Sequence, residues 1–285
     1  MPVAEAELDI AHLRGWIGRT ERAEDTLSPR LVTELRATLD KAASADRSEP
    51  LTAHWCLAPP AAPMSGLGPD GHPARGGFLP PVPLPRRMWA GGALEFHDPI
   101  RVGDDVARES RIADVTMKHG GTGTLVFVTV EHRYSTSRGL AISERQDIVY
   151  RRAPVPGATV SQPTAPSSPR EAGWRREVQA DPVLLFRYSA LTFNGHRIHY
   201  DRSYCVEEEG YPGLVVHGPL QATLLVELAE AARGGQPPRS FRFRGVRPLF
   251  DGGILSACAS EAEGGLDLWI EDGGGHPTMT ARAEW

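Results

Sequence analysis

Groups that can move protons or bind anions are concentrated in one short loop of the chain. They are an amide, two imidazoles and a guanidinium: Asn194, His196, Arg197 and His199. A neutral imidazole can accept a proton at neutral pH, an amide can orient a water molecule, and the forked guanidinium matches a carboxylate. The loop therefore predicts proton-transfer chemistry, with His199 as the candidate base and Asn194 as its partner. His196 is a candidate substrate contact and the next candidate for the base.

A second group of interest follows further along the chain, where His217 and Gly218 directly precede a long apolar run. Glycine lets a carbonyl oxygen approach a backbone N–H closely, and a helix N-terminus favours negative charge. The pattern predicts an oxyanion site at Gly218 opposite the base. His217 is expected to support the loop or contact substrate, as is Tyr188 on the preceding helix.

Composition excludes several classes of protein. The net charge of -5 and pI near 6.1 provide no domain-wide basic field, which argues against a nucleic-acid partner. The cysteines Cys56, Cys205 and Cys258 are far apart, which favours a reducing compartment without disulfides. The first nine residues lack an apolar signal core, and no apolar run is long enough to cross a membrane. We expect a cytoplasmic protein without membrane partners.

The first half of the chain predicts helices followed by strands. Residues 8–18 have near-helical apolar spacing, and Ser28-Pro29 starts a second helix with a serine cap and proline at the first position. From residue 91 to residue 150, four segments rich in Val, Ile, Phe and Thr alternate with glycine-bearing turns. Residues 1–152 are therefore expected to form an α+β unit in which both helices precede every strand.

Between these helices and strands lies a stretch, residues 57–85, in which nearly half the residues are proline or glycine. It is either a floppy surface loop or an ordered loop covering a ligand, since long loops inside compact domains are often functional. Arg86, Arg87 and Trp89 follow directly. Adjacent arginines beside an indole could bind a phosphate and stack on a base, or could simply be solvated surface. We assign the three residues as candidate substrate contacts, on the carrier part of the thioester.

Residues 153–178 are interpreted as a proline- and serine-rich linker, and residues 179–285 as a second α+β unit. In that unit Asp181-Pro182 starts a helix, the polar loop follows, and residues 218–233 form a helix too apolar to lie in water. Four further strand-like segments follow. A buried helix cupped by an antiparallel sheet, present twice, predicts a double hot-dog fold.

The run from Phe186 to Asp201, followed by His217-Gly218-Pro219-Leu220, resembles the MaoC-like hydratases. These are (R)-specific enoyl-thioester hydratases and dehydratases of double hot-dog fold. The likeness is strongest to mesaconyl-CoA and itaconyl-CoA hydratases and to mitochondrial 3-hydroxyacyl-thioester dehydratases. It implies an acyl-CoA substrate, no separate cofactor, and a possible homodimer. It also implies that the first half is non-catalytic and supplies the acyl pocket and carrier contacts.

The family's active loop carries an aspartate with a histidine five residues later, and the matching positions here are Asn194 and His199. Asn194 thus departs from the family pattern. A 3-hydroxyacyl-ACP dehydratase, a hot-dog thioesterase and a catalytically silent acyl-thioester-binding module remain as alternatives. Arg197 is the candidate partner for a second substrate carboxylate, unless it pairs with Asp201. We expect no metal, because two residues separate His196 from His199 and no thiol or carboxylate completes a zinc set.

Overall fold

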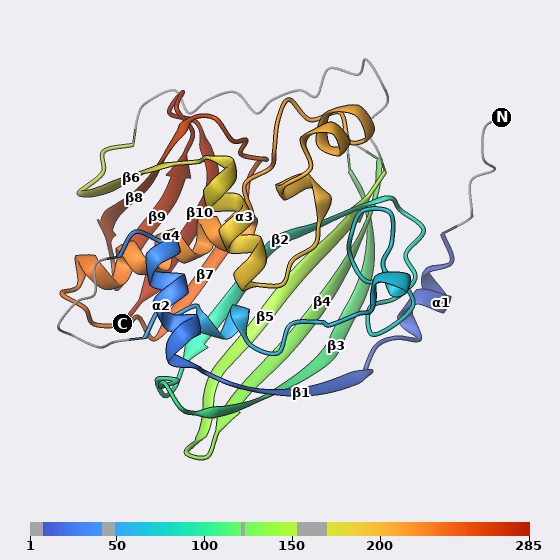
Figure 1. Ribbon diagram of the computed structural model, residues 1–285, viewed down its shortest axis with the longest axis horizontal. Coiled ribbons are helices and arrows are strands. Elements are labelled where there is room, and N and C mark those ends of the chain that lie inside the picture. Colours follow the sequence, from blue (N-terminus) through green and yellow to red (C-terminus); the bar gives the residue numbers. More distant parts are fainter. Residues whose placement is uncertain (1–7, 42–48, 121–122, 153–169) are drawn as a thin grey trace.

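The computed structural model describes residues 8–41, 49–120, 123–152 and 170–285. Its strands form one antiparallel sheet of ten (Figure 1). They are β1 (Thr20–Thr26), β2 (Arg86–Phe96), β3 (Asp105–Gly120), β4 (Gly123–Thr136), β5 (Gly139–Arg151), β6 (Trp174–Gln179), β7 (Ser240–Gly245), β8 (Ile254–Ala262), β9 (Gly265–Glu271) and β10 (Pro277–Glu284). The α-helices are α1 (Ile10–Arg14), α2 (Pro29–Thr38), α3 (Pro182–Leu191) and α4 (Gly218–Ala232). None of the helices described is long and apolar enough to cross a membrane.

The second half of the sheet repeats the first. The strand order is β1-β3-β4-β5-β2-β7-β10-β9-β8-β6, so the first strand of each half, β1 or β6, lies at an outer edge and the second, β2 or β7, lies at the centre. The halves join where β2 pairs with β7, from Gly91 opposite Arg244 to Glu95 opposite Ser240. The predicted α+β class and the internal repeat are confirmed, although the two half-sheets form one continuous sheet.

Helix α4 is the centre of the second half. Eleven consecutive residues of this helix, from Leu220 to Glu230, are buried. They pack against the inward side chains of β8, β9 and β10, in a cluster that also contains residues of α2 and α3. Figure 1 shows α4 in orange against the sheet, with α2 and α3 in front of it. A mainly apolar helix that is buried on all sides is stable only when other elements surround it in this way.

The first half differs from the prediction because no central helix is present among its described residues. Residues 49–85 instead form two short 3-10 helices and an extended loop, drawn in cyan in Figure 1. Val82 and Leu84 of this loop are buried against valines of β4, in a cluster that also includes Leu13 of α1. Proline and glycine prevent the loop from becoming a helix, but its apolar side chains still cover the sheet.

Two strands occupy positions that the sequence did not predict. β1 lies between α1 and α2, so the expectation that two helices precede every strand is wrong. β6 begins at Trp174, so the last residues assigned to the linker belong to the second half's sheet. Residues 153–169 of that linker lie outside the described part of the chain. Both strands are sheet edges with mostly exposed or half-buried side chains. They therefore lack the apolar alternation used to recognise strands.

Candidate active site

His199 has the environment of a general base. Its Nδ1 lies 2.7 Å from the carbonyl oxygen of Val215. Because a carbonyl can only accept, Nδ1 carries the proton and the lone pair of the neutral ring is on Nε2. Burial lowers the pKa of His199 to about 4, although the hydrogen bond to Val215 opposes this shift. At neutral pH the ring is therefore neutral, oriented, and able to accept a proton at Nε2.

Asn194 is turned into its own loop. Helix α3 ends just before it, and Phe193 adopts a φ of 49°, which reverses the chain direction. The Oδ1 of Asn194 accepts the backbone N–H of His196 at 3.0 Å. Since Oδ1 serves the loop, the Nδ2 amide hydrogens remain as the groups that can orient a water molecule.

His217 supports His199 from behind. The two rings stack with centroids 3.7 Å apart and planes 18° apart. The Nε2 of His217 lies 2.8 Å from the hydroxyl of Ser189, and burial lowers the pKa of His217 well below its usual range. Tyr188 meets His217 edge-on, and its hydroxyl lies 3.3 Å from that of Thr223. The phenol thus points into the core, so Tyr188 is placed as a packing residue and not as a substrate contact.

Gly218 is the first residue of α4 and is half-buried. In the described part of the chain no carbonyl accepts its N–H. A Cβ at this position would lie 3.7 Å from the carbonyl oxygen of Trp89 and 4.0 Å from Cε of Met279, which are ordinary contacts. The fold itself therefore does not require glycine here. Glycine leaves the space at the helix N-terminus open, where a carbonyl oxygen can accept the N–H as it gains negative charge.

The loop at residues 57–85 crosses the active loop at two glycines. A Cβ on Gly71, whose φ is 84°, would lie 2.0 Å from the carbonyl oxygen of Gly195. A Cβ on Gly195 would lie 2.8 Å from the carbonyl oxygen of Gly71. The backbone N–H of Arg197 donates to the carbonyl oxygen of Asp70 at 2.9 Å. These contacts favour the interpretation of an ordered loop covering the site.

Docking of this loop brings two titratable residues of the first half to the site. His72 Nδ1 lies 3.2 Å from Asp70 Oδ2, and the His72 ring centroid lies 4.1 Å from that of His196. The His196 ring is in turn 5.3 Å from that of His199. Burial lowers the pKa of both His72 and His196. Burial opposes ionisation of Asp70, but its hydrogen bonds with His72 outweigh this effect and the pKa falls to about 2.

Asp70 and His72 were not predicted from the sequence as residues of the site. The first half was assigned only acyl-pocket and carrier contacts, and that assignment must now include a carboxylate and an imidazole next to His196. One signal was available, because Asp70-Gly71-His72 lies within the loop that had been singled out as a possible cover of a ligand. Ser189 was missed as well, since nothing in a sequence shows that its hydroxyl meets His217.

Arg197 has partners within the protein. Its guanidinium forms an ion pair with Asp201 at 2.8 Å and donates to the carbonyl oxygen of Pro69. It also stacks over Tyr204 at 4.1 Å from the ring centroid. The alternative that Arg197 pairs with Asp201 and supports the loop is therefore the one that the structure favours over binding of a substrate carboxylate.

Two of the predicted substrate contacts, Arg86 and Trp89, have partners within the protein. Arg86 is buried, forms an ion pair with Glu209 at 3.0 Å and lies over the ring of Tyr211. Trp89 packs edge-on against Trp55, with ring centroids 5.2 Å apart. These partners argue against phosphate binding by Arg86 and base stacking by Trp89. Arg87 alternates with Arg86 on β2 and therefore lies on the other face of the sheet, opposite Tyr150.

Asp70, His72 and His196 could hold a metal ion, since each offers a ligand atom and these atoms lie within 4.8 Å of one another. The set differs from the three histidines considered from the sequence. The charge of Arg87 contributes to lowering the pKa of all three groups, and the same charge repels a cation. The absence of a metal in the reaction remains a prediction.

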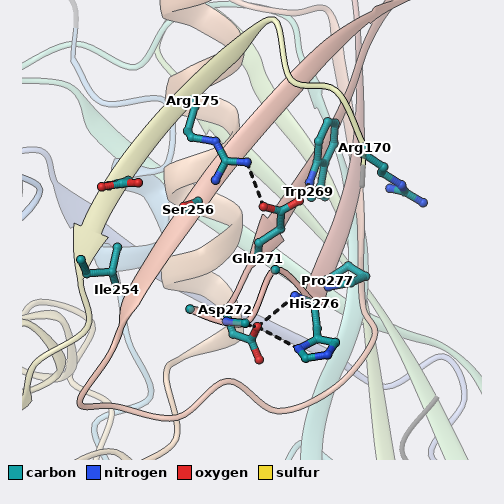
Figure 2. Close-up of a pocket in the computed structure, with 13 residues that line it drawn as sticks. Arg170, Arg175, Ile254, Ser256, Trp269, Glu271, Asp272, His276 and Pro277 are labelled. Atoms are coloured by element: carbon teal, nitrogen blue, oxygen red, sulfur yellow. Dashed lines mark hydrogen bonds and ion pairs between the residues drawn. The ribbon is translucent and has the colours of Figure 1, made fainter. Parts of the chain in front are cut away.

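A separate hollow lies on the face of the second half's sheet opposite α4 (Figure 2). Glu271 lies at its centre and accepts from Arg175 at 3.0 Å and from the indole N–H of Trp269 at 2.6 Å. Asp272 and His276 close one end of the hollow. Glu271 is paired with Arg175 in this hollow, and none of the residues that line it belongs to the site around His199.

Solved structures of other proteins share this fold. HtdX from Mycobacterium tuberculosis matches with a TM-score of 0.66 at 19% identity, covering 93% of this chain and 98% of that one. A second Mycobacterium tuberculosis protein, described as having a double hotdog fold, matches with a TM-score of 0.56 at 14% identity, covering 94% of this chain and 95% of that one. At such identities the likeness shows the fold, which is the predicted double hot-dog.

The chain belongs to the hydroxyacyl-thioester dehydratase type 2 (Htd2) family, whose model matches residues 52–251. It is also 46% identical to the mesaconyl-C(4)-CoA hydratase of Chloroflexus aurantiacus over 281 residues, which cover 97% of this chain and 99% of that protein. The predicted MaoC-like resemblance and the assignment as a hydro-lyase acting on thioesters are confirmed at the level of the family.

Proposed function

We propose that this protein catalyses the reversible addition of water to a 2-enoyl-CoA thioester of the mesaconyl-C4 type, giving the 3-hydroxyacyl thioester. The observation that carries the proposal is the combination of a buried, neutral His199 with an open helix N-terminus at Gly218. One group can accept a proton from water and the other can stabilise an enolate. The high identity to the Chloroflexus enzyme supports the choice of acyl group.

In the proposed reaction the thioester carbonyl oxygen accepts the N–H of Gly218. Asn194 donates from Nδ2 to a water molecule, and that water donates to Nε2 of His199. The water oxygen bonds to the β-carbon while His199 takes one of its protons, and the double-bond electrons move toward the α-carbon and the carbonyl oxygen. A single donor to such an oxygen contributes about 3 kcal/mol of transition-state stabilisation. A positioned base contributes a factor of about 10²–10⁴ in rate.

The second half of the addition returns the proton. The imidazolium of His199 donates to the α-carbon, and the enolate collapses to the saturated thioester. Hydrogen and hydroxyl are then added from one side of the double bond, and His199 is neutral again. Read in reverse, the same groups remove water from a 3-hydroxyacyl thioester, which is the reaction for which the family is named.

Purified protein should be mixed with crotonyl-CoA and mesaconyl-C4-CoA, recording enoyl absorbance and free thiol together. The expected result is loss of enoyl absorbance without release of thiol, faster with the dicarboxylic substrate. Thiol release would instead indicate a thioesterase, and a bound but unchanged thioester would indicate a binding module. Repeating the assay with the same acyl groups on acyl carrier protein tests the alternative of a 3-hydroxyacyl-ACP dehydratase.

A further inference from the structure

Three arginines near the two crossing loops differ in how their charge is compensated. Arg86 has Glu209 as its ion-pair partner, and Arg197 has Asp201. Within the described part of the chain no carboxylate lies within ion-pair distance of Arg87. A cation without a close counter-ion at the edge of an active site has capacity for an anionic ligand.

Arg87 faces the inside of the sheet. On β2 it lies directly opposite Tyr150 of β5, a residue buried in the core beneath the loop. Side chains alternate along a strand, so Arg87 shares its face with Trp89 and not with Arg86. The guanidinium of Arg75, which belongs to the same loop as His72, lies over the ring of Tyr150 at 5.7 Å from its centroid, so Arg87 lies on the face of the sheet that this loop covers. In agreement with this position, the charge of Arg87 contributes to lowering the pKa of Asp70, of His72 and of His196.

The distance along β2 matches the length of a short acyl chain. The carbonyl of Trp89 lies next to Gly218, where the thioester oxygen is proposed to bind. Arg87 is two residues away, about 7 Å along the strand. A mesaconyl-C4 thioester has its free carboxylate on the β-carbon, at the end of the four-carbon chain opposite the thioester. With the thioester oxygen at Gly218, that carboxylate falls in the region of Arg87.

We propose that Arg87 binds the β-carboxylate of the substrate, and that His72, held in place by Asp70, forms the neighbouring wall of this carboxylate pocket. This inference rests on the proposed function and names the residues that select a dicarboxylic acyl group. Asp70 accepts both the backbone N–H and the Nδ1 proton of His72, which orients the imidazole toward His196.

The test compares two substrates with the wild type and with Arg87→Met, Arg87→Lys and His72→Gln. Arg87→Met is expected to lower kcat/KM for mesaconyl-C4-CoA at least about a hundredfold, since truncating one member of a charge pair has effects of this size. Hydration of crotonyl-CoA, which has no second carboxylate, should stay within about threefold. Arg87→Lys should lose less than Arg87→Met, and His72→Gln should lose about tenfold on the dicarboxylic substrate alone. Circular dichroism of each variant verifies that it is folded.

Equal losses on both substrates in Arg87→Met and His72→Gln would overturn the inference and make these residues general supports of the site. Unchanged hydration of mesaconyl-C4-CoA by Arg87→Met would overturn it as well. So would loss of wild-type activity on chelation followed by recovery with Zn²⁺, because Asp70 and His72 would then hold a metal ion together with His196. Should Arg87→Met fail to fold, Arg87→Lys and His72→Gln decide between the same outcomes. If the wild type hydrates neither thioester, the proposed function itself fails, which is distinguishable from failure of the carboxylate site.

Discussion

Replacement of His199 tests the proposed base most directly, and two substitutions separate its chemical role from its structural one. His199→Gln retains an N–H that can reach the carbonyl of Val215, whereas His199→Ala leaves that acceptor without its partner. Leaving a buried acceptor unpaired costs about 1–3 kcal/mol of folding free energy. His199→Ala also removes the ring that stacks on His217. The alanine variant should therefore be clearly less stable than the glutamine variant.

Turnover should respond differently from stability. Neither glutamine nor alanine can accept a proton from water, so both variants should lose a factor of about 10²–10⁴ in kcat. At about 1.4 kcal/mol per factor of ten, this loss corresponds to roughly 3–5 kcal/mol of transition-state stabilisation. KM should change little, because the thioester is proposed to bind at Gly218.

The assay is hydration of mesaconyl-C4-CoA and crotonyl-CoA followed by enoyl absorbance, with thermal unfolding of each variant. His97→Gln is the matched control, because His97 lies on the surface of the first half and contacts Ser143. That control should retain turnover within a few fold. If His199→Gln kept more than a tenth of the wild-type kcat, the base would lie elsewhere, and His196 would be the next candidate.

Three further predictions follow from the same geometry. Asn194→Asp places a carboxylate near His199 and should raise the pKa of His199 from about 4. Because only the neutral ring acts as base, the acid limb of the pH–rate profile should move to higher pH; an unmoved limb would mean that residues 194 and 199 do not share one site. Gly218→Ala should fold with equal or greater thermal stability, because alanine favours the helix and its Cβ makes only ordinary contacts. Its kcat/KM should fall at least about tenfold, because the methyl group occupies the space in which the thioester oxygen would reach the N–H of residue 218; full activity would mean that this space is not used. Burial lowers the pKa of His54 to about 3 and of His132 to about 4, so the folded state binds fewer protons than the unfolded state below about pH 6.5. Stability should be complete above that pH and fall toward pH 4 by up to about 1.4 kcal/mol per pH unit for each histidine, and equal urea midpoints at pH 7.5 and pH 5 would refute the assignment.

Local signals in the sequence determined the second half well. Helix α4 was predicted within one residue of its observed end, because its apolar run is too long to be solvated and begins at Gly218-Pro219. The starts of α2 and α3 were also recognised, because each has a capping side chain followed by proline, and the cap accepts a backbone N–H only three residues away. The candidate base could be named from its loop because a dense group of imidazole and amide side chains is rare in a purely structural segment.

What the sequence could not provide was the pairing of groups far apart in the chain. The local ion pair of Arg197 with Asp201, four residues away, was among the alternatives that the sequence offered, whereas the distant contacts were not. The contact of His72 with His196 depends on a loop crossing at Gly71 and Gly195, which no local pattern encodes. The different environments of Arg86 and Arg87 follow from their opposite faces on β2 and from what packs there.

The fold shows the same division between local and tertiary information. Strands with one buried face carry an apolar alternation that the sequence displays, whereas the polar edge strands β1 and β6 are defined only by their hydrogen-bonded neighbours β3 and β8. The joining of β2 to β7 likewise depends on which strand edges meet. Short-range hydrogen bonds and side-chain types, which can be read from the sequence, determine the local conformation and which groups can do chemistry. Which distant groups contact one another is decided only when the complete chain packs.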